Sequence, residues 1–354
     1  MRSSIILNSI LVVVWGCFTL SCSEPAQESE AGTPKNDVTS YLGQWTFDFG
    51  KRSVGWLQVR QEEGYLDADL MWGGGSVAYG LPYVYVAEGK LHLGRNPRNA
   101  VLTRNAEGET ELERSYPTWI ELDRSGDNIS GYYLSPKVNG NGLDSVYIEG
   151  RKVPEMPPTP DLTKAEFGEP ISLIKNDNDL TGWRLLEEEL TNGWSVKEGV
   201  LTNDPVQVEG AKHIGYGNLR TDEVFEDFNI KLEVNTPARS NSGVYLRGMY
   251  EVQVADSYEH PLSWGGSLGA IFTRITPTVK AERPSGEWQE LDITLYKRHV
   301  TVILNGVTII NNQPVHGPTG GAMQSDVTAP GPIYLQGDHT AISYRNIVLT
   351  PIIN

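Results

Sequence analysis

The residues best suited to chemistry lie in one short stretch of the chain, Asn241–Asp256. Polar and apolar residues alternate with period two on both sides of Gly248-Met249, which predicts two strands joined by a tight turn at that dipeptide. The apolar face of this predicted hairpin carries Val244, Leu246, Val252 and Val254. The opposite face then carries Tyr245, Arg247, Glu251 and Gln253.

This face combines an aromatic ring with a guanidinium, a carboxylate and an amide. Such a set can bind the hydroxyl groups of a sugar. An ordinary outer face would more often carry Lys, Thr and Ser. The alternative is that Arg247 and Glu251 form a solvated ion pair on such an outer face. The stretch alone favours neither reading over the other.

His339 is a second candidate for chemistry. It follows the predicted strand Ile333–Gln336 after Gly337-Asp338. From a loop, an imidazole can serve as a base or as a metal ligand, because it gains and loses a proton near neutral pH. The other histidines, at positions 92, 213, 260, 299 and 316, stand at no metal-ligand spacing with it. A histidine hydrogen-bonded in a turn is the alternative. No cofactor is indicated with certainty, and a divalent cation remains open.

Composition points to an all-β protein. The chain has 354 residues, among them 37 Gly, 9 Trp and 16 Tyr, and it lacks long helical periodicities. Turn-rich chains of this kind form sandwiches or barrels. The net charge of −16 excludes nucleic acid as a partner, because no basic stripe is present to neutralise phosphates.

The N-terminus predicts export. Residues 1–21 have a positive start and an apolar core, as in a signal peptide. Thr19-Leu-Ser-Cys22 resembles a bacterial lipobox, with Thr19 where that pattern prefers Leu. The resemblance implies lipidation of Cys22 and a protein anchored to the outer membrane of the cell envelope, on its periplasmic or its outer side. Cys17 and a plain secreted protein cut near Ala26 are the alternatives. Residues 22–38 are acidic and poor in apolar residues, which predicts a flexible tether.

Residues 39–153 are predicted to form a first β domain. Short strand candidates alternate there with turns such as Gly73-Gly-Gly75 and Asn139-Gly-Asn-Gly142, which favours an up-and-down antiparallel sheet or small barrel. Gly43-x-Trp45 loosely resembles the start of calycin barrels. The aromatic residues of this domain are interpreted mainly as core. Residues 154–166 hold four prolines and are predicted to be a semi-rigid linker.

Residues 167–354 are predicted to form a second β domain. Phe228–Val234 and Leu291–Tyr296 alternate cleanly, and Asn305-Gly306 is typical of a two-residue hairpin turn. About a dozen strands without a long helix favour a two-sheet jelly roll.

Several segments together resemble one family over residues 167–352. They are Ile171–Trp183, Trp194–Leu201, Asn241–Asp256, Gly286–Trp288, Leu304–Gly306, Gly331–His339 and Tyr344–Ile347. They resemble the 3-keto-disaccharide hydrolases, a family with a concanavalin-like jelly roll related in fold to family 16 glycoside hydrolases. The resemblance implies cleavage of glycosides oxidised at C3, by hydrolysis or by lyase and hydratase steps.

One departure from laminarinase-type enzymes bears on mechanism. Those enzymes place acidic residues at alternate positions, whereas this chain reads Glu251-x-Gln253-x-Ala255. Glu251 therefore lacks a carboxylate partner on its face, and Asp256 joins it only if the strand bulges. Cleavage of a 3-keto sugar does not need a second carboxylate, because the ketone acidifies the proton at C2 and a single base can remove it. Glu251 or His339 is the expected base, with Arg247 or a cation stabilising the enolate.

The remaining expected contacts are with the sugar. Tyr245, Gln253 and Gln336 are expected to orient hydroxyls, Asp256 is a further candidate contact, and Trp264 is a candidate stacking platform at the cleft rim. A glycan-binding protein of lectin type remains the alternative to an enzyme, because jelly rolls often bind glycans without chemistry.

Overall fold

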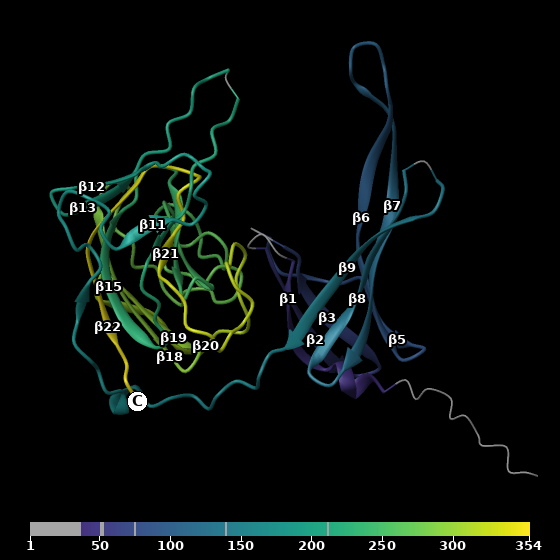
Figure 1. Ribbon diagram of the computed structural model, residues 1–354, viewed down its shortest axis with the longest axis horizontal. Helices are drawn as coiled ribbons and strands as arrows, with labels where there is room; N and C mark the ends of the chain where they lie inside the picture. The colour runs from purple at the N-terminus through teal and green to yellow at the C-terminus, as the bar shows by residue number, and fades with distance from the viewer. Residues whose placement is uncertain (1–36, 50–52, 74–75, 139, 211) are drawn as a thin grey trace, which may run out of the picture. The chain divides into compact units, whose positions relative to one another are not determined.

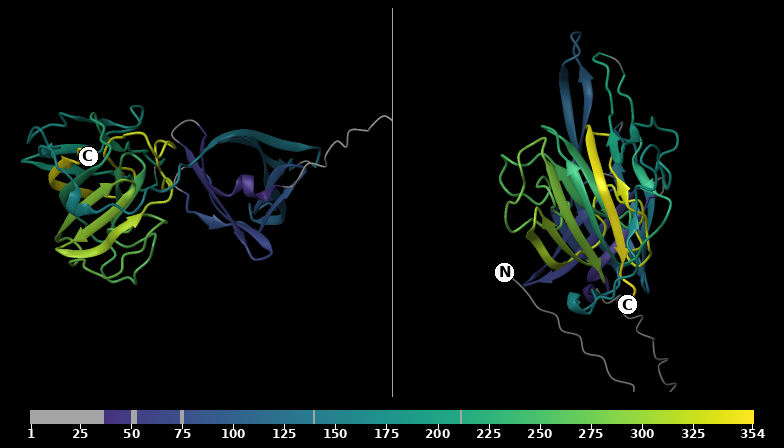
Figure 2. Two further views of the ribbon diagram at one scale, coloured as in Figure 1. Left: turned by 90° about the horizontal axis from the view of Figure 1, so that it is seen from below. Right: turned by 90° about the vertical axis from the view of Figure 1, so that its left-hand side faces the viewer.

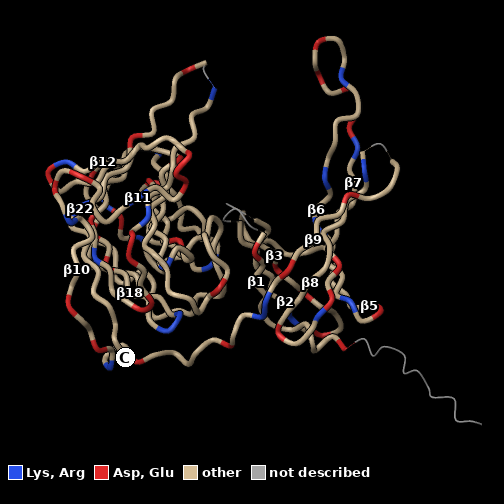
Figure 3. Tube along the Cα trace, viewed as in Figure 1, with Lys and Arg blue, Asp and Glu red and all other residues tan. Residues whose placement is uncertain are grey.

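The computed structural model describes residues 37–49, 53–73, 76–138, 140–210 and 212–354. Cys17 and Cys22 lie outside the described residues. The helices of the described residues are two short 3₁₀ segments, η1 (Val38–Tyr41) and η2 (Leu162–Lys164). None of these described helices is long and apolar enough to cross a membrane. The predicted all-β class is confirmed, and charged residues of both signs are spread along the trace (Figure 3).

The first part of the chain forms one antiparallel sheet. Its strands are β1 (Gly43–Asp48), β2 (Val54–Glu62), β3 (Tyr65–Met71), β4 (Tyr79–Gly80), β5 (Tyr83–Ala87), β6 (Lys90–Arg104), β7 (Thr110–Ser125), β8 (Asn128–Pro136) and β9 (Leu143–Lys152). The order is β4-β3-β2-β1-β9-β8-β7-β6-β5, so chain neighbours pair, except β4 and β5 at the two ends, and β9 pairs with β1. The sheet curves round on itself (Figures 1 and 2). The predicted up-and-down sheet is therefore confirmed.

The inside of this curved sheet is its apolar core. Trp45 and Phe47 of β1, together with Leu57 and Val59 of β2, are fully or almost fully buried there. In the first part of β6 and the second part of β7, buried residues alternate with less buried ones, as expected for a sheet with one buried face. Trp45 also donates its indole N–H to the Tyr41 carbonyl at 2.9 Å, which satisfies a buried polar group.

The second part of the chain forms two further sheets. The larger has the order β12-β13-β22-β15-β18-β19-β20, with β10 paired to β22, and the smaller has the order β11-β14-β21-β16-β17. The strands of the larger sheet are β10 (Ile171–Ser172), β12 (Trp194–Lys197), β13 (Val200–Asn203), β15 (Phe228–Asn235), β18 (Trp288–Tyr296), β19 (His299–Leu304), β20 (Val307–Pro314) and β22 (Ile342–Pro351). Those of the smaller sheet are β11 (Trp183–Leu185), β14 (Leu219–Thr221), β16 (Asn241–Leu246), β17 (Tyr250–Ala255) and β21 (Tyr334–Leu335).

The two sheets form a sandwich with one shared core. Phe228, Ile230, Leu232 and Val234 of β15 alternate inward as predicted, and all of them are buried. They belong to the same apolar cluster as Val244 and Val252 of the smaller sheet. Asn305 and Gly306 have φ of 50° and 80°, which confirms the predicted hairpin turn between β19 and β20. The arrangement is the predicted concanavalin-like jelly roll.

Between Lys152 and Ile171 the described chain contains no sheet strand, only η2. The prolines of this segment supply carbonyl acceptors to the second part of the chain. Arg298 donates to the Pro154 carbonyl at 2.9 Å, and Asn312 donates to the Pro160 carbonyl at 2.8 Å. The segment is therefore held along the sandwich by side chains that reach its backbone.

Candidate active site

The β16–β17 hairpin separates apolar and polar residues onto two faces. Val244, Leu246, Val252 and Val254 are fully buried in the sandwich core, as predicted. On the opposite face, the register sets Tyr245 across from Glu251 and Gly243 across from Gln253. These polar residues therefore lie on the outer face of the smaller sheet.

Arg247 does not lie on that face. Met249 N–H donates to the Leu246 carbonyl at 3.0 Å, so the central residues of the turn are Arg247 and Gly248, with φ of 56° and 63°. The turn is therefore one residue earlier than predicted, and its left-handed backbone takes Arg247 out of the strand alternation. The prediction that Arg247 shares a face with Glu251 is wrong.

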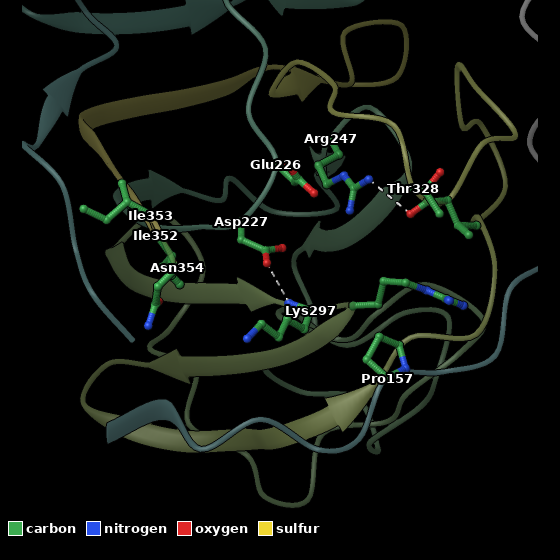
Figure 4. A pocket seen from close by; sticks show the side chains of 11 residues that line it. Pro157, Glu226, Asp227, Arg247, Lys297, Thr328, Ile352, Ile353 and Asn354 are labelled. Atoms are coloured by element: carbon green, nitrogen blue, oxygen red, sulfur yellow. Dashed lines mark hydrogen bonds between the residues drawn. The ribbon is translucent and has the colours of Figure 1, made fainter. Parts of the chain in front are cut away.

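Arg247 instead lines a different cavity of about 490 Å³. Its guanidinium donates to the carbonyls of Val327, at 3.1 Å, and of Ala329. Figure 4 shows Arg247 in this cavity with Glu226, Asp227 and Lys297. A guanidinium held in this way is not available to an enolate beside Glu251.

Glu251 lies in a cavity of about 160 Å³ on the outer face of the smaller sheet. The cavity brings together five predicted residues, namely Tyr245, Glu251, Gln253, Gln336 and His339. Residues that sequence reasoning did not single out complete the lining, and these are Asn241, Gly265, Phe272, Gly320 and Gly321. Among the residues that the structure describes around this cavity, Glu251 is the one carboxylic acid.

The Glu251 carboxyl is almost fully buried, with 3% of the residue exposed. Gly243 makes room for it, because a Cβ at Gly243 would lie 2.4 Å from Glu251 Oε1. Burial raises the pKa of Glu251 to about 8, and the hydrogen bond from Tyr245 acts in the opposite direction. The carboxyl therefore holds its proton far more strongly than an exposed glutamate does.

Tyr245 fixes the position of this carboxyl. Its hydroxyl lies 2.8 Å from Glu251 Oε2 and 2.8 Å from the Gly320 carbonyl oxygen. A hydroxyl has only one hydrogen to donate, so both contacts are satisfied together when Glu251 is protonated and donates to Tyr245. When Glu251 is ionised, the Tyr245 hydroxyl can donate to it instead. The pair can thus accept or release one proton without a large rearrangement.

Packing behind the pair restricts its motion. The Tyr245 ring stacks on Tyr334 with centroids 3.9 Å apart. A Cβ at Gly321 would lie 2.5 Å from the Tyr245 hydroxyl, so this glycine allows the loop to approach. Thr319 accepts a hydrogen bond from the Glu251 backbone N–H at 2.9 Å and donates to the Met249 carbonyl. The carboxyl is therefore held from both its side chain and its backbone.

The segment after β21 brings Gln336 and His339 to the cavity. Two residues between them anchor this segment. The Gly337 carbonyl accepts from Asn203 at 2.7 Å, and the Asp338 carboxylate accepts from the Tyr216 N–H at 2.9 Å. His339 is exposed at the cavity opening. The Gln336 Oε1 atom is buried and has no hydrogen-bond partner among the described residues. An orphaned acceptor beside a cavity is a place for a ligand hydroxyl.

A loop along the outer edge of β17 forms the remaining wall. Phe272 N–H donates to the Glu251 carbonyl at 3.0 Å, and Gln253 N–H donates to the Ala270 carbonyl at 2.9 Å. Trp264 is 44% exposed on this loop. It is next to Gly265, which lines the cavity, but Trp264 does not line it. The expected stacking contact of Trp264 therefore lies outside the cavity itself.

Asp256 belongs to another place on the surface. It follows the last residue of β17, and its Oδ2 accepts the Arg239 N–H at 2.8 Å. It lines a separate cavity with Tyr258 and His260. Asp256 was expected to join Glu251 only through a strand bulge, and the β16–β17 register is continuous to Ala255. As a contact in the Glu251 cavity, Asp256 is a wrong prediction.

Within the described residues, no group of three or more His, Cys, Asp and Glu side chains is arranged to hold a metal ion. The sequence left a divalent cation open, and the described side chains identify no ligand set for one.

Comparison with solved structures finds β proteins that match about half of this chain. A protein from Parabacteroides distasonis ATCC 8503, assigned as a glycosyl hydrolase, is 33% identical over 50% of this chain and 81% of its own, with a TM-score of 0.41. The carbohydrate-binding module CBM66 from Bacillus subtilis is 11% identical over 47% of this chain and 93% of its own, with a TM-score of 0.33. LamA from Zobellia galactanivorans, solved with laminaritriose and laminaritetraose, is 10% identical over 53% and 98%, with a TM-score of 0.32.

No curated protein matches the chain. A protein-family model, described as the 3-keto-alpha-glucoside-1,2-lyase-like domain, matches residues 169–350. The matched range exceeds half of the 354 residues, and it contains both sheets of the sandwich and the Glu251 cavity. The chain therefore belongs to the 3-keto-alpha-glucoside-1,2-lyase-like domain family, and this part of it is a carbohydrate-active, glycosyl hydrolase-like domain.

Proposed function

We propose that the sandwich domain cleaves glycosides that carry a ketone at C3, and that Glu251 is the base that removes the proton from C2. The observation that carries the proposal is a single buried carboxyl in a cavity of about 160 Å³. That cavity is smaller than the roughly 300–1,000 Å³ of pockets for drug-sized ligands. It therefore suits one sugar ring better than several.

The lone carboxyl argues against ordinary glycoside hydrolysis. That reaction usually needs two carboxyl groups about 5–9.5 Å apart on either side of the scissile bond. Gln253 stands on the same strand two residues after Glu251 and supplies an amide instead. An amide can orient a hydroxyl, but near neutral pH it cannot act as a nucleophile or as a general acid. The lining residues therefore favour a reaction that needs a single base.

Elimination from a 3-keto glycoside is such a reaction. The base takes the C2 proton, and the electron pair of the C2–H bond forms the C2–C3 double bond of an enolate. The enolate then re-forms the C3 carbonyl while a double bond forms between C1 and C2. The bond between C1 and the leaving oxygen breaks, and its electron pair stays on that oxygen. A proton delivered to the leaving oxygen completes the cleavage.

The other cavity residues have assignable parts in this scheme. Tyr245 orients the Glu251 carboxyl through its 2.8 Å hydrogen bond. We assign to His339, which lines the cavity and is exposed, the protonation of a leaving group that departs toward solvent. Gln336 Oε1 is an acceptor for a ring hydroxyl. Arg247 has no part, because it lines the other cavity.

The raised pKa of Glu251 suits a base. A carboxylate whose conjugate acid has a pKa of about 8 is a stronger base than an exposed one, and general bases work best when their pKa is near the operating pH. The ionised fraction rises with pH up to about that value. We therefore expect the limb of the kcat/KM profile that reports Glu251 ionisation to rise with pH and to bend near pH 8.

The test is incubation of the full chain with the 3-keto form and the unoxidised form of one disaccharide, followed by product analysis. We expect cleavage of the 3-keto form and little cleavage of the other, whose C2 proton is not acidic. Glu251→Gln keeps the shape of the side chain and removes the base, so its rate should fall roughly 10²–10⁴-fold. Asp256→Asn is the matched control, because Asp256 lies in a separate cavity.

Equal cleavage of both disaccharides would overturn the mechanism, as would full activity in Glu251→Gln. Binding of both sugars without any cleavage would favour the glycan-binding alternative. Loss of activity in Asp256→Asn to the same extent would show that the assay reports folding rather than the base.

A further inference from the structure

A row of side chains crosses the outer face of the first sheet. The strand registers pair Tyr85 with His92, His92 with Glu121, Glu121 with Tyr132, and Tyr132 with Tyr147. These five residues come from the consecutive strands β5, β6, β7, β8 and β9, which are neighbours in the sheet (Figure 1). Sequence spacing does not reveal the row, because it depends on the register of all five strands.

The row faces away from the core. Leu91 and Leu93, on either side of His92, are fully buried, and so are Ile120 and Leu122, on either side of Glu121. The tyrosines of the row are instead exposed, at 52% for Tyr85, 49% for Tyr132 and 53% for Tyr147. The prediction that the aromatic residues of this domain are mainly core is therefore wrong for these tyrosines.

Contacts within the face order the rings. Tyr85 stacks on His92 with centroids 4.8 Å apart and planes at 5°, and the Tyr132 and Tyr147 rings meet edge to face at 5.4 Å. The Tyr147 hydroxyl donates to Glu149 Oε1 at 3.0 Å. Side chains held in this way lose little further freedom when a ligand lies on them.

The charge on this face selects the kind of ligand. Glu121 Oε1 accepts the Trp119 indole N–H at 2.8 Å and Glu149 Oε1 accepts from Tyr147, so the second oxygen of each carboxylate is the one offered to a ligand hydroxyl. Lys90 is the cation next to the row on β6, and it is paired with Asp123 at 2.6 Å. The face therefore suits a ligand that is uncharged and rich in donors, and it repels phosphates and carboxylates.

We infer that this row binds a neutral glycan chain. Ring faces carry partial negative charge, so they attract the partly positive C–H groups of a pyranose, while the carboxylates accept its hydroxyls. Strands lie about 4.8 Å apart, so four intervals span roughly 19 Å. That length accommodates several sugar rings, in contrast to the single-ring cavity at Glu251. The inference concerns a site separate from the proposed reaction.

The test is affinity gel electrophoresis of the full chain in gels that contain mixed-linkage β-glucan, xylan, galactomannan or polygalacturonate. We expect at least one neutral polysaccharide to retard the chain and polygalacturonate not to do so. Tyr132→Ala and Tyr85→Ala should each weaken retardation roughly 2- to 10-fold, on the scale of one aromatic contact. Tyr132→Phe keeps the ring and should bind nearly as the parent does. Tyr65→Ala, at a tyrosine that is 61% exposed on β3, is the matched control.

The inference is wrong if no neutral polysaccharide retards the chain, or if Tyr132→Ala and Tyr85→Ala are retarded like the parent. Retardation by polygalacturonate alone would also overturn it. A dimer in solution that dissociates in Tyr132→Ala would show that a second copy of the chain covers the row instead. Cleavage of the 3-keto disaccharide should be unchanged in all these variants, so failure here is distinguishable from failure of the proposed reaction.

Discussion

Burial of Glu251 works against the stability of the fold. The residue keeps only 3% of its surface exposed, and its carboxyl is hydrogen-bonded to the Tyr245 hydroxyl. Its pKa is raised to about 8, whereas an unfolded glutamate titrates near 4.3. Groups whose pKa is shifted in this direction are typical of functional sites, where stability is traded for reactivity.

The first prediction concerns stability as a function of pH. Below about pH 4.3 the Glu251 carboxyl is protonated in both states and has no effect. Between about 4.3 and 8 only the folded state keeps the proton, so the free energy of unfolding falls as pH rises, by about 1.4 kcal/mol per pH unit. Above about 8 the loss is complete. Glu251→Gln lacks this effect. Its free energy of unfolding, measured by urea unfolding, should therefore rise relative to that of the parent between pH 5 and 8.

The control for that measurement is Glu290→Gln, at a glutamate on the outer face of β18. It should track the parent across the same range. Parallel pH curves for Glu251→Gln and the parent would contradict the assigned environment of Glu251.

Residue-level reasoning from the sequence was partly successful. Glu251, Tyr245 and Gln253 were assigned to one face because strand alternation is a strong local signal. Arg247 was misplaced because the left-handed backbone at the turn breaks that alternation, and a non-glycine residue gives little warning of positive φ. Phe272 was missed because it reaches the cavity on an irregular loop, for which the sequence has no periodic signal.

At the scale of elements, the β16–β17 hairpin accommodates the Glu251 carboxyl because β16 carries a glycine beside it. Gly243 on β16 faces Gln253 on β17, and its missing side chain leaves room for the neighbouring carboxyl. A glycine inside a strand ordinarily weakens it, and such a glycine often marks a close approach. Gly321, which lies on a loop, likewise leaves room for the Tyr245 hydroxyl because it has no side chain.

The second prediction tests this arrangement through Gly243→Ala. The added Cβ would lie 2.4 Å from Glu251 Oε1, so the carboxyl must move. Because a misplacement of about 1 Å can cost on the order of 10²-fold in rate, we expect a loss of that size in kcat/KM on the 3-keto disaccharide. Gly265→Ala is the control in the same cavity, since its Cβ would meet Phe272 at an ordinary 3.8 Å. Equal activities of the two variants would rule out this role for Gly243.

Much of the element pattern could be predicted, because alternation and turn chemistry are local. The inward residues of β15 and the Asn305-Gly306 turn are examples, and both are confirmed. The partnership of strands is not local. The pairing of β16 with β21, which brings Tyr245 beside Tyr334, joins residues far apart in the chain. The family resemblance predicted that His339 lies near the hairpin, whereas alternation alone could not.

At the scale of the whole molecule, the proposed reaction and the inferred glycan row lie on different sheets. The Glu251 cavity is on the smaller sheet of the sandwich, and the tyrosine row is on the first sheet. A chain with both would hold a polymer by one part and cleave small oxidised glycosides with the other. Export, as predicted from residues 1–21, would bring both to the cell envelope, on its periplasmic or its outer side.

The third prediction concerns the N-terminal anchor. Cys22 lies outside the described residues, and its lipidation rests on the lipobox resemblance of Leu20-Ser-Cys22. Cys22→Ala should move the protein from the membrane fraction to the soluble fraction, because a lipid chain supplies the membrane affinity. Cys17→Ala is the matched control and should stay membrane-bound. If both variants remain in the membrane fraction, the assignment of Cys22 is wrong.

The last prediction concerns the proline segment between the two β regions. The sandwich part is predicted to fold without the first sheet, but the structure shows that it uses the segment's backbone. Arg298 is buried and donates to the carbonyls of Pro154, at 2.9 Å, and Glu155, at 3.2 Å. A fragment of residues 154–354 keeps these acceptors, whereas a fragment of residues 165–354 loses both carbonyl acceptors of the Arg298 guanidinium. Hydrogen bonds to charged groups contribute about 1.5–3 kcal/mol, so the shorter fragment should be less stable by an amount of that order in urea unfolding. Arg298→Met in both fragments is the control, because it removes the need for the acceptors and should narrow the difference. Equal stability of the two unsubstituted fragments would show that the proline segment is only a spacer.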